Sequence, residues 1–219
     1  MDNQEQAANN RLVLLMIVGI PLTMVLAATW LWYFVVRGDL DVVAMLGTAN
    51  RGSLVQPPRS LLPVALRDDR GRAFDAAELG RHWTMLVPVA GTDCEEICEQ
   101  TLYTTRQIHL AMGKEYKRIR RAMVSSTAIA EMNLGVAALS DDHPLPEDFE
   151  GYLDTEHRGL RALQVSASDM RALFPERFAE PSTWYLVDPA GWIMMTYDSG
   201  IPYKDVMADL KFLLKNSND

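Results

Sequence analysis

An uncharged run of 25 residues near the N-terminus, from Leu12 to Val36, constrains the fold of this chain more than any other feature. At about 1.5 Å per residue, a helix of this length crosses a hydrocarbon core of roughly 30 Å. Its C-terminal end is rich in the aromatic residues of an interfacial belt, Trp30, Trp32, Tyr33 and Phe34. A cleavable signal peptide would have a shorter apolar region of about 7–15 residues that ends in small residues. The run therefore predicts a transmembrane helix over 12–36.

The charge balance narrows the functions open to the rest of the chain. The net charge is −8, the isoelectric point is near 5.0, and no Lys/Arg-rich run is present, which argues against nucleic-acid binding. Two cysteines are too few for a secreted scaffold held by disulfides. Residues 37–60 show no sustained period and contain the sequence QPPR, so we expect a linker or an extended arm against the domain.

Residues 61–219 have the pattern of one α/β domain. We expect a short strand, a turn and a helical turn over 61–79, and then the order strand, helix, strand, helix, hairpin, helix. The corresponding ranges are 82–90, the cysteines to Met112, 118–126, 166–174, 183–198 and 202–216. One parallel crossover followed by an antiparallel pair implies a mixed sheet flanked by helices, which is the layout of the thioredoxin fold.

Both cysteines lie at the expected junction between strand 82–90 and the helix after it, in the sequence GTDCEEICEQ. A helix N-terminus stabilises a thiolate, whereas the neighbouring acids, among them Glu95 and Glu99, oppose one. Cys94 and Cys98 stand at i and i+4, so we expect them to share one helix face. Such a pair can chelate a soft ion such as Cu(I), close a disulfide if the first turn is irregular, or be two inert buried residues. The polar flanks count against the buried alternative.

At this point the chain resembles the Sco/SenC family of membrane-anchored, thioredoxin-like cytochrome c oxidase assembly proteins. The resemblance covers roughly 61–216 and rests on the anchor, on LRDDRGRAF, on Thr92, Cys94 and Cys98, and on YLVDPAG in the hairpin. It implies copper binding through both cysteines and one histidine, and a role in building the dinuclear copper centre of the oxidase. It also implies a single-pass protein of the bacterial inner membrane, with residues 1–11 as a cytoplasmic tail and the soluble domain in the periplasm.

The chain departs from the family pattern at its ligands. Glu95 and Glu99 stand where the family has proline, and Glu180 occupies the position of the copper-binding histidine. A carboxylate is a hard ligand and a poor substitute for imidazole with Cu(I). The histidines of this chain, His82, His109, His143 and His157, offer no obvious replacement.

Two further features have an ordinary interpretation and a functional one. Pro181 lies one position off the place where thioredoxin-like proteins have a cis-proline, so we expect a trans bond there. The stretch from Asp141 to Glu156 contains seven acids and no Lys or Arg, which predicts a solvated loop, or else a surface for a basic partner.

These observations favour a membrane-anchored factor that does thiol–disulfide work through Cys94 and Cys98 on a partner's copper-site cysteines, with weak copper binding. The partner would be an oxidase subunit or another assembly factor. One alternative is a copper chaperone with an unidentified third ligand. The other is a non-redox assembly scaffold whose cysteines form a structural disulfide.

Overall fold

The computed structural model describes residues 2–37 and 50–217, and these divide into two compact units. The first unit contains one helix, α1 (Asp2–Arg37). Within α1, Leu15–Tyr33 has a mean hydropathy of 1.9, so this helix is long and apolar enough to cross a membrane. This confirms the predicted candidate span, although the helix itself begins before residue 12.

The second unit is built on a mixed sheet of eight strands, as predicted for a thioredoxin-like domain. The strands β4, β6 and β8 are parallel, and the other pairings are antiparallel. Their spatial order is β1 (Ser53–Ser60), β10 (Trp192–Tyr197), β9 (Trp184–Val187), β4 (Trp83–Val89), β6 (Ile119–Ser125), β8 (Arg161–Gln164), β2 (Leu66–Asp68) and β3 (Ala73–Phe74).

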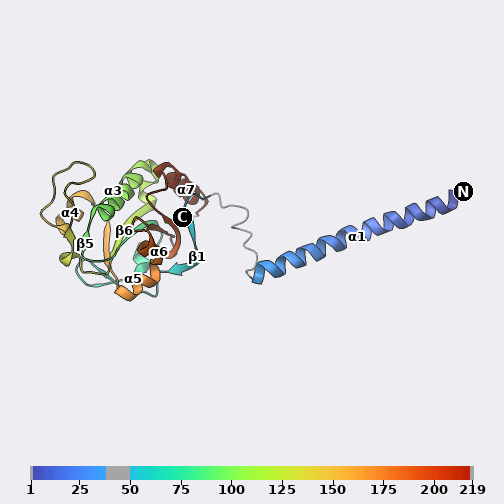
Figure 1. The fold of residues 1–219 in the computed structure, drawn as a ribbon, viewed down its shortest axis with the longest axis horizontal. Helices are drawn as coiled ribbons and strands as arrows, with labels where there is room; N and C mark the ends of the chain where they lie inside the picture. The colour runs from blue at the N-terminus through green and yellow to red at the C-terminus, as the bar shows by residue number, and fades with distance from the viewer. Residues whose placement is uncertain (1, 38–49, 218–219) are drawn as a thin grey trace. The chain divides into compact units, whose positions relative to one another are not determined.

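Helices cover both faces of this sheet (Figure 1). They are α3 (Glu96–Ala111), α4 (Phe149–Glu156), α5 (Ala167–Leu173), α6 (Pro175–Ala179) and α7 (Tyr203–Asn216), with 3-10 turns η1 (Ala76–Leu79), η2 (Gly113–Arg118) and η3 (Ile129–Glu131). A separate parallel pair, β5 (Asp93–Cys94) and β7 (Asn133–Leu134), lies beside the start of α3.

The sheet separates two hydrophobic clusters. One contains Met85 and Val87 of β4 together with apolar residues of α3 and α7. The other contains Leu86 of β4 together with apolar residues of α5. All seven residues of β4 are buried, because a central strand covered on both faces has no solvent side.

The predicted linker over 37–60 needs a correction. Residues 38–49 lie outside the described part of the chain, but Ser53–Ser60 forms edge strand β1, and the compact unit begins at Asn50. The pairing of β1 with β10 slips between Leu54 and Arg59, around the two prolines of QPPR. An edge strand tolerates proline because its outer N–H groups need no partner, so the extended-arm alternative is the one that the structure shows.

Candidate functional site

Cys94 and Cys98 form a disulfide just beyond the end of β4, with an S–S distance of 2.02 Å and a Cα–Cα distance of 5.1 Å. The expectation that both cysteines share one face of a helix is wrong. Cys94 ends β5, Glu95 is the extended N-cap residue, and only Cys98 lies in the first turn of α3. The irregular helix start brings the two Cα atoms within the limit of about 7 Å for a bridge.

Backbone hydrogen bonds hold Cys94 in place. β5 pairs in parallel with β7, so that Cys94 lies opposite Leu134. The N–H of Gly135 donates to the carbonyl of Cys94 at 3.0 Å, and the N–H of Asn133 donates to the carbonyl of Thr92 at 2.8 Å. Cys98 therefore belongs to α3, and Cys94 belongs to a strand pair whose second strand, β7, lies in the chain between β6 and β8.

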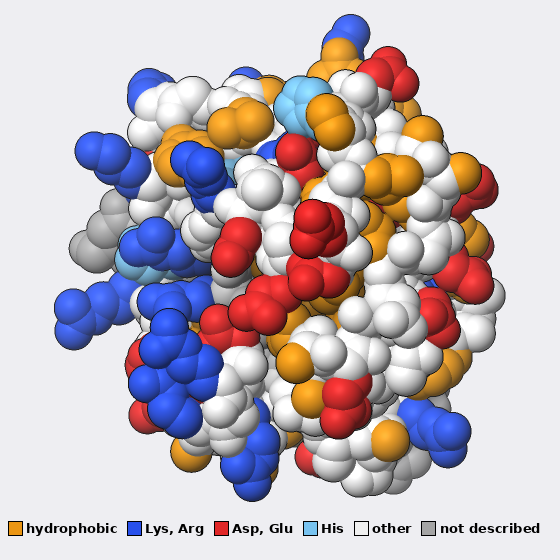
Figure 2. All heavy atoms as spheres, turned by 90° about the vertical axis from the view of Figure 1, so that its left-hand side faces the viewer, with side chains coloured by type: hydrophobic (Ala, Val, Ile, Leu, Met, Phe, Trp, Pro, Cys, Tyr) orange, Lys and Arg blue, Asp and Glu red, His pale blue; other side chains and the backbone are white. Residues whose placement is uncertain are grey.

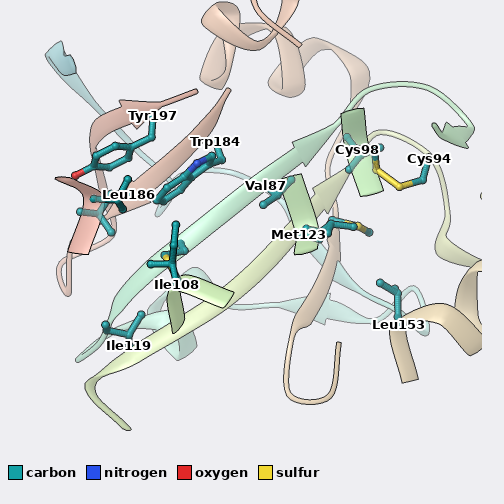
Figure 3. Packing of buried hydrophobic residues seen from close by; sticks show 14 of the residues in the cluster. Val87, Cys94, Cys98, Ile108, Ile119, Met123, Leu153, Trp184, Leu186 and Tyr197 are labelled. Atoms are coloured by element: carbon teal, nitrogen blue, oxygen red, sulfur yellow. A yellow bond between two sulfur atoms is a disulfide. The ribbon is translucent and has the colours of Figure 1, made fainter. Parts of the chain in front are cut away.

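Residues 126–160, which connect β6 to β8, form the crossover segment, and this segment covers the disulfide. Cys94 is 0% and Cys98 6% exposed, and both belong to the cluster between the sheet and α3. The crossover segment contributes Met132, Leu139 and Phe149 to the same cluster. Figure 3 shows the disulfide at one end of the central strands, beyond Val87 and Met123. The argument that polar flanks exclude burial is thus wrong, because the flanking acids Asp93, Glu95 and Glu96 point to solvent while the sulfurs point inward.

Glu99, the residue after Cys98, is a buried acid that the sequence reading treated as a polar flank. It is 4% exposed and accepts hydrogen bonds from the N–H and hydroxyl of Ser140 and, at 3.5 Å, from the hydroxyl of Tyr152. A negative charge is favourable near the N-terminus of α3. The same carboxylate disfavours a thiolate on Cys98 when the pair is reduced. Its spacing of three from Leu102, a buried residue of α3, is the signal that could have placed it on the inner face of the helix.

The crossover segment is tied to α3 by Arg106. Its guanidinium donates to Glu156 at 2.7 Å and also to Asp141. Burial works against the charge of Arg106, but its hydrogen bonds to Glu156 and Asp141 outweigh that cost and raise its pKa. The pKa of Asp141 is lowered because the bond from Arg106 outweighs burial. The predicted solvated loop over 141–156 needs a correction in two respects, because Phe149–Glu156 forms α4 and because Asp141 and Glu156 pair with the half-buried Arg106, while the other five acids are exposed as expected.

The histidines do not complete a copper site with the cysteines. Within the described ranges 2–37 and 50–217, which hold every histidine, the only group of three or more His, Cys, Asp or Glu ligand atoms mutually within 4.8 Å is Asp141, His143 and Glu156. His109 lies against the carbonyls of Tyr116 and Ile119, at 2.9 and 3.1 Å. Nδ1 of His82 lies 3.4 Å from the carbonyl of Gly80, and Nδ1 of His157 accepts a bond from Arg121 at 3.2 Å.

Glu180 and Pro181 have local roles in the structure. The Glu180 carboxylate is exposed and accepts bonds from the N–H and hydroxyl of Ser182, at 3.2 and 2.9 Å. The bond before Pro181 is trans, as predicted, since the only cis peptide among the described residues is Gln56–Pro57. Among the described residues, neither a histidine nor Glu180 therefore completes the set of two sulfurs and one imidazole that the resemblance implies for copper.

Comparisons with known proteins agree with this fold. The model of a family described as transmembrane-like, thioredoxin-like, C-terminal domain matches residues 83–217. No curated protein matches the chain significantly in sequence.

Solved structures of Sco proteins are similar in fold. Yeast Sco1 with copper bound has 14% identity and a TM-score of 0.52, over 78% of this chain and 97% of that one. Arabidopsis thaliana ScoI with copper bound has 14% identity and a TM-score of 0.50, over 76% of this chain and 99% of that one. The resemblance to Sco proteins is thus confirmed, and at this identity what it shows is the shared fold.

Proposed function

The chain belongs to the transmembrane-like, thioredoxin-like C-terminal domain family, and on that premise we propose that it is a membrane-anchored factor in cytochrome c oxidase biogenesis. We place its thioredoxin-like domain in the periplasm and its work on the copper-site cysteines of an oxidase subunit or of another assembly factor. The observation that carries the proposal is the Cys94–Cys98 bridge between the end of β4 and the first turn of α3. A dithiol at a strand-to-helix junction is placed for thiol–disulfide exchange.

The exchange is written for a partner whose two copper-site cysteines are oxidised. The thiolate of Cys98, the more exposed of the pair, attacks one sulfur of the partner's disulfide and forms a mixed disulfide, and the second partner sulfur leaves as a thiolate and takes a proton. The thiolate of Cys94 then attacks Cys98 Sγ and releases the other partner thiol. The partner gains two electrons and two protons, the Cys94–Cys98 disulfide forms, and a small dithiol reductant must restore the reduced pair.

Access to the sulfurs requires the crossover segment to move, because both cysteines are buried. This burial favours a second candidate, a non-redox assembly scaffold in which the disulfide only fastens the start of α3. Copper is treated as cargo, and we expect the reduced pair to bind it weakly, since among the described residues no histidine forms a ligand group with the two sulfurs.

Mixed-disulfide trapping distinguishes the thiol–disulfide exchange role from the scaffold role. The full chain in a non-ionic detergent is reduced, freed of reductant and mixed with an oxidised copper-site subunit of the oxidase. Cys94→Ser retains the attacking thiol but cannot resolve the intermediate, so we expect it to accumulate a mixed disulfide. Cys98→Ser is the matched control and should accumulate none.

The scaffold candidate predicts a different result. Native cysteines would stay bridged in millimolar dithiothreitol for as long as the domain is folded, and neither single variant would trap the subunit. Cys94→Ala/Cys98→Ala would then lower the amount of folded protein while each remaining molecule still supported oxidase assembly. That combination would overturn the redox role and leave the assembly role in place.

A further inference from the structure

Arg121 is a buried cation with an incomplete set of partners. It lies on β6, is 5% exposed, and uses Nη2 for all its hydrogen bonds, to the carbonyl of Leu102 at 2.8 Å, to Thr105 Oγ1 at 3.2 Å and to His157 Nδ1 at 3.2 Å. Its Nε is buried and has no partner among the described residues. Because His157 accepts through Nδ1, its proton is on Nε2, a buried donor that likewise has no partner there.

No carboxylate of the described residues pairs with Arg121. Within the described part of the chain, no Asp or Glu oxygen lies within 4.0 Å of its guanidinium, whereas Arg106 has two such acids. Burial and the nearby charge of Arg106 lower the pKa of Arg121 to about 9. A buried charge is costly unless it is paired, so this guanidinium favours an anion beside it.

Arg121 lines a surface groove that carries more positive charge. The groove has a volume of about 320 Å³, and Lys117, Arg120 and Arg158 line it at the surface. None of the described residues that line it is an acid, and no ion pair joins these three side chains to a described residue, although the chain as a whole has a net charge of −8. The face in Figure 2 shows basic side chains gathered along its left side, apart from a central group of acids.

We propose that this groove binds a phosphate-type oxyanion, either free inorganic phosphate or the headgroup of an anionic phospholipid. A guanidinium is a favoured donor group for phosphate oxygens, and Nε of Arg121 is a donor that no described residue uses. The surface cations Lys117, Arg120 and Arg158 neutralise the remaining oxygens. A water has a share of about 30 Å³ in the liquid, so the groove has room for a phosphate group and several waters. The site is separate from Cys94 and Cys98 and does not depend on their chemistry.

The test is calorimetric titration of the full chain in dodecyl maltoside. The probes are inorganic phosphate and short-chain phosphatidylglycerol, with short-chain phosphatidylcholine, whose headgroup is zwitterionic with no net charge, as the control. We expect Arg121→Gln to weaken binding of the active probe about tenfold or more, which corresponds to about 1.4 kcal/mol. Arg120→Gln/Arg158→Gln changes only exposed residues, so it tests the groove even where Arg121→Gln fails to fold, and we expect a loss of severalfold.

Arg171→Gln is the matched control, because Arg171 is exposed on α5 and does not line the groove. Binding of inorganic phosphate that the groove variants weaken identifies a free anion as the ligand. Binding of phosphatidylglycerol alone, with the same variant pattern, identifies a lipid headgroup. Absence of binding by both probes, or equal losses in Arg171→Gln and the groove variants, would overturn the proposal.

Discussion

Two arginines beside α3 differ in how their charges are met. Arg106 of α3 is half-buried and donates to Asp141 and Glu156 of the crossover segment, which also contributes to the cluster around the disulfide. Arg121 of β6 is buried and donates only to neutral acceptors, and the cations beside it line an open groove. Their pKa values shift in opposite directions, raised for Arg106 and lowered for Arg121.

This difference shows which of the two cations is satisfied by its own chain. A cation paired with carboxylates ties one segment to another and leaves little for a ligand to gain. A cation with an unpartnered donor leaves that gain available to an anion from outside. The crossover segment therefore has to move before the sulfurs react, whereas the groove beside Arg121 is already open to a ligand.

The largest effect is expected from removing the ion pairs of Arg106, which tie the crossover segment to α3. Arg106→Met leaves Asp141 and Glu156 together without their cation, and we expect the free energy of unfolding to fall by about 2–3 kcal/mol in urea titrations. The disulfide should also be reduced faster by dithiothreitol in the folded state, because the crossover segment loses its tie to α3.

Arg120→Met is the matched control for that change. Arg120 is exposed and pairs with no described carboxylate, so the variant should stay within about 0.5 kcal/mol of the native protein. A native rate of disulfide reduction in Arg106→Met would show that the crossover segment does not control access to the sulfurs.

The sequence predicted the elements whose pattern is local. β4 is an almost continuous apolar run, the β9–β10 hairpin has its Asp-Pro-Ala-Gly turn, and α7 has a regular apolar stripe. The elements it missed have no such pattern. β8 has four residues, and α4 was hidden within an acidic stretch whose partner Arg106 is 50 residues away from Glu156.

The candidate site was predicted in part for the same reason. The spacing of the cysteines and their position between a strand and a helix were enough to predict that Cys94 and Cys98 lie within bonding distance. Their burial depends on the crossover segment, and the partners of Glu99 lie 41 and 53 residues further along the chain. Nothing local indicates that a carboxylate will pair with Arg106 and none with Arg121.

A moderate loss of stability is expected at acidic pH, and it tests the surroundings of Arg121 through its partner His157. Burial, with the charges of Arg121 and Arg106, lowers the pKa of His157 to about 2. In the unfolded chain the His157 imidazole binds a proton near pH 6.5, whereas in the folded chain it stays neutral there. The contribution of His157 to stability is therefore fully present above pH 6.5 and is lost as the pH falls below that value. Between pH 7 and 5.5 we expect a loss of about 1.3 kcal/mol from this residue in denaturant titrations.

His157→Asn removes this titration but retains an acceptor for Arg121. We expect the variant to lose less stability than the native chain over the same pH range. The remaining dependence would include His109, whose pKa burial also lowers, against its bonds to the carbonyls of Tyr116 and Ile119. Equal pH slopes in the two proteins would mean that His157 is protonated in the folded state, and its bond from Arg121 would then have to break.

The smallest effect is expected at Glu180, the position where the resemblance would place a copper-binding histidine. Its carboxylate is exposed and bonds to Ser182 within its own turn, while both sulfurs are buried beneath the crossover segment. An imidazole at 180 has no open path to buried sulfurs, so Glu180→His should change the Cu(I) affinity of the reduced chain less than about threefold, or about 0.7 kcal/mol. The measurement is competition with a chromophoric Cu(I) chelator, with Cys94→Ser/Cys98→Ser as the baseline without thiols. A gain of tenfold or more would show that the crossover segment moves away from the sulfurs in the reduced protein and that residue 180 then reaches them. That result would restore the copper-carrier alternative.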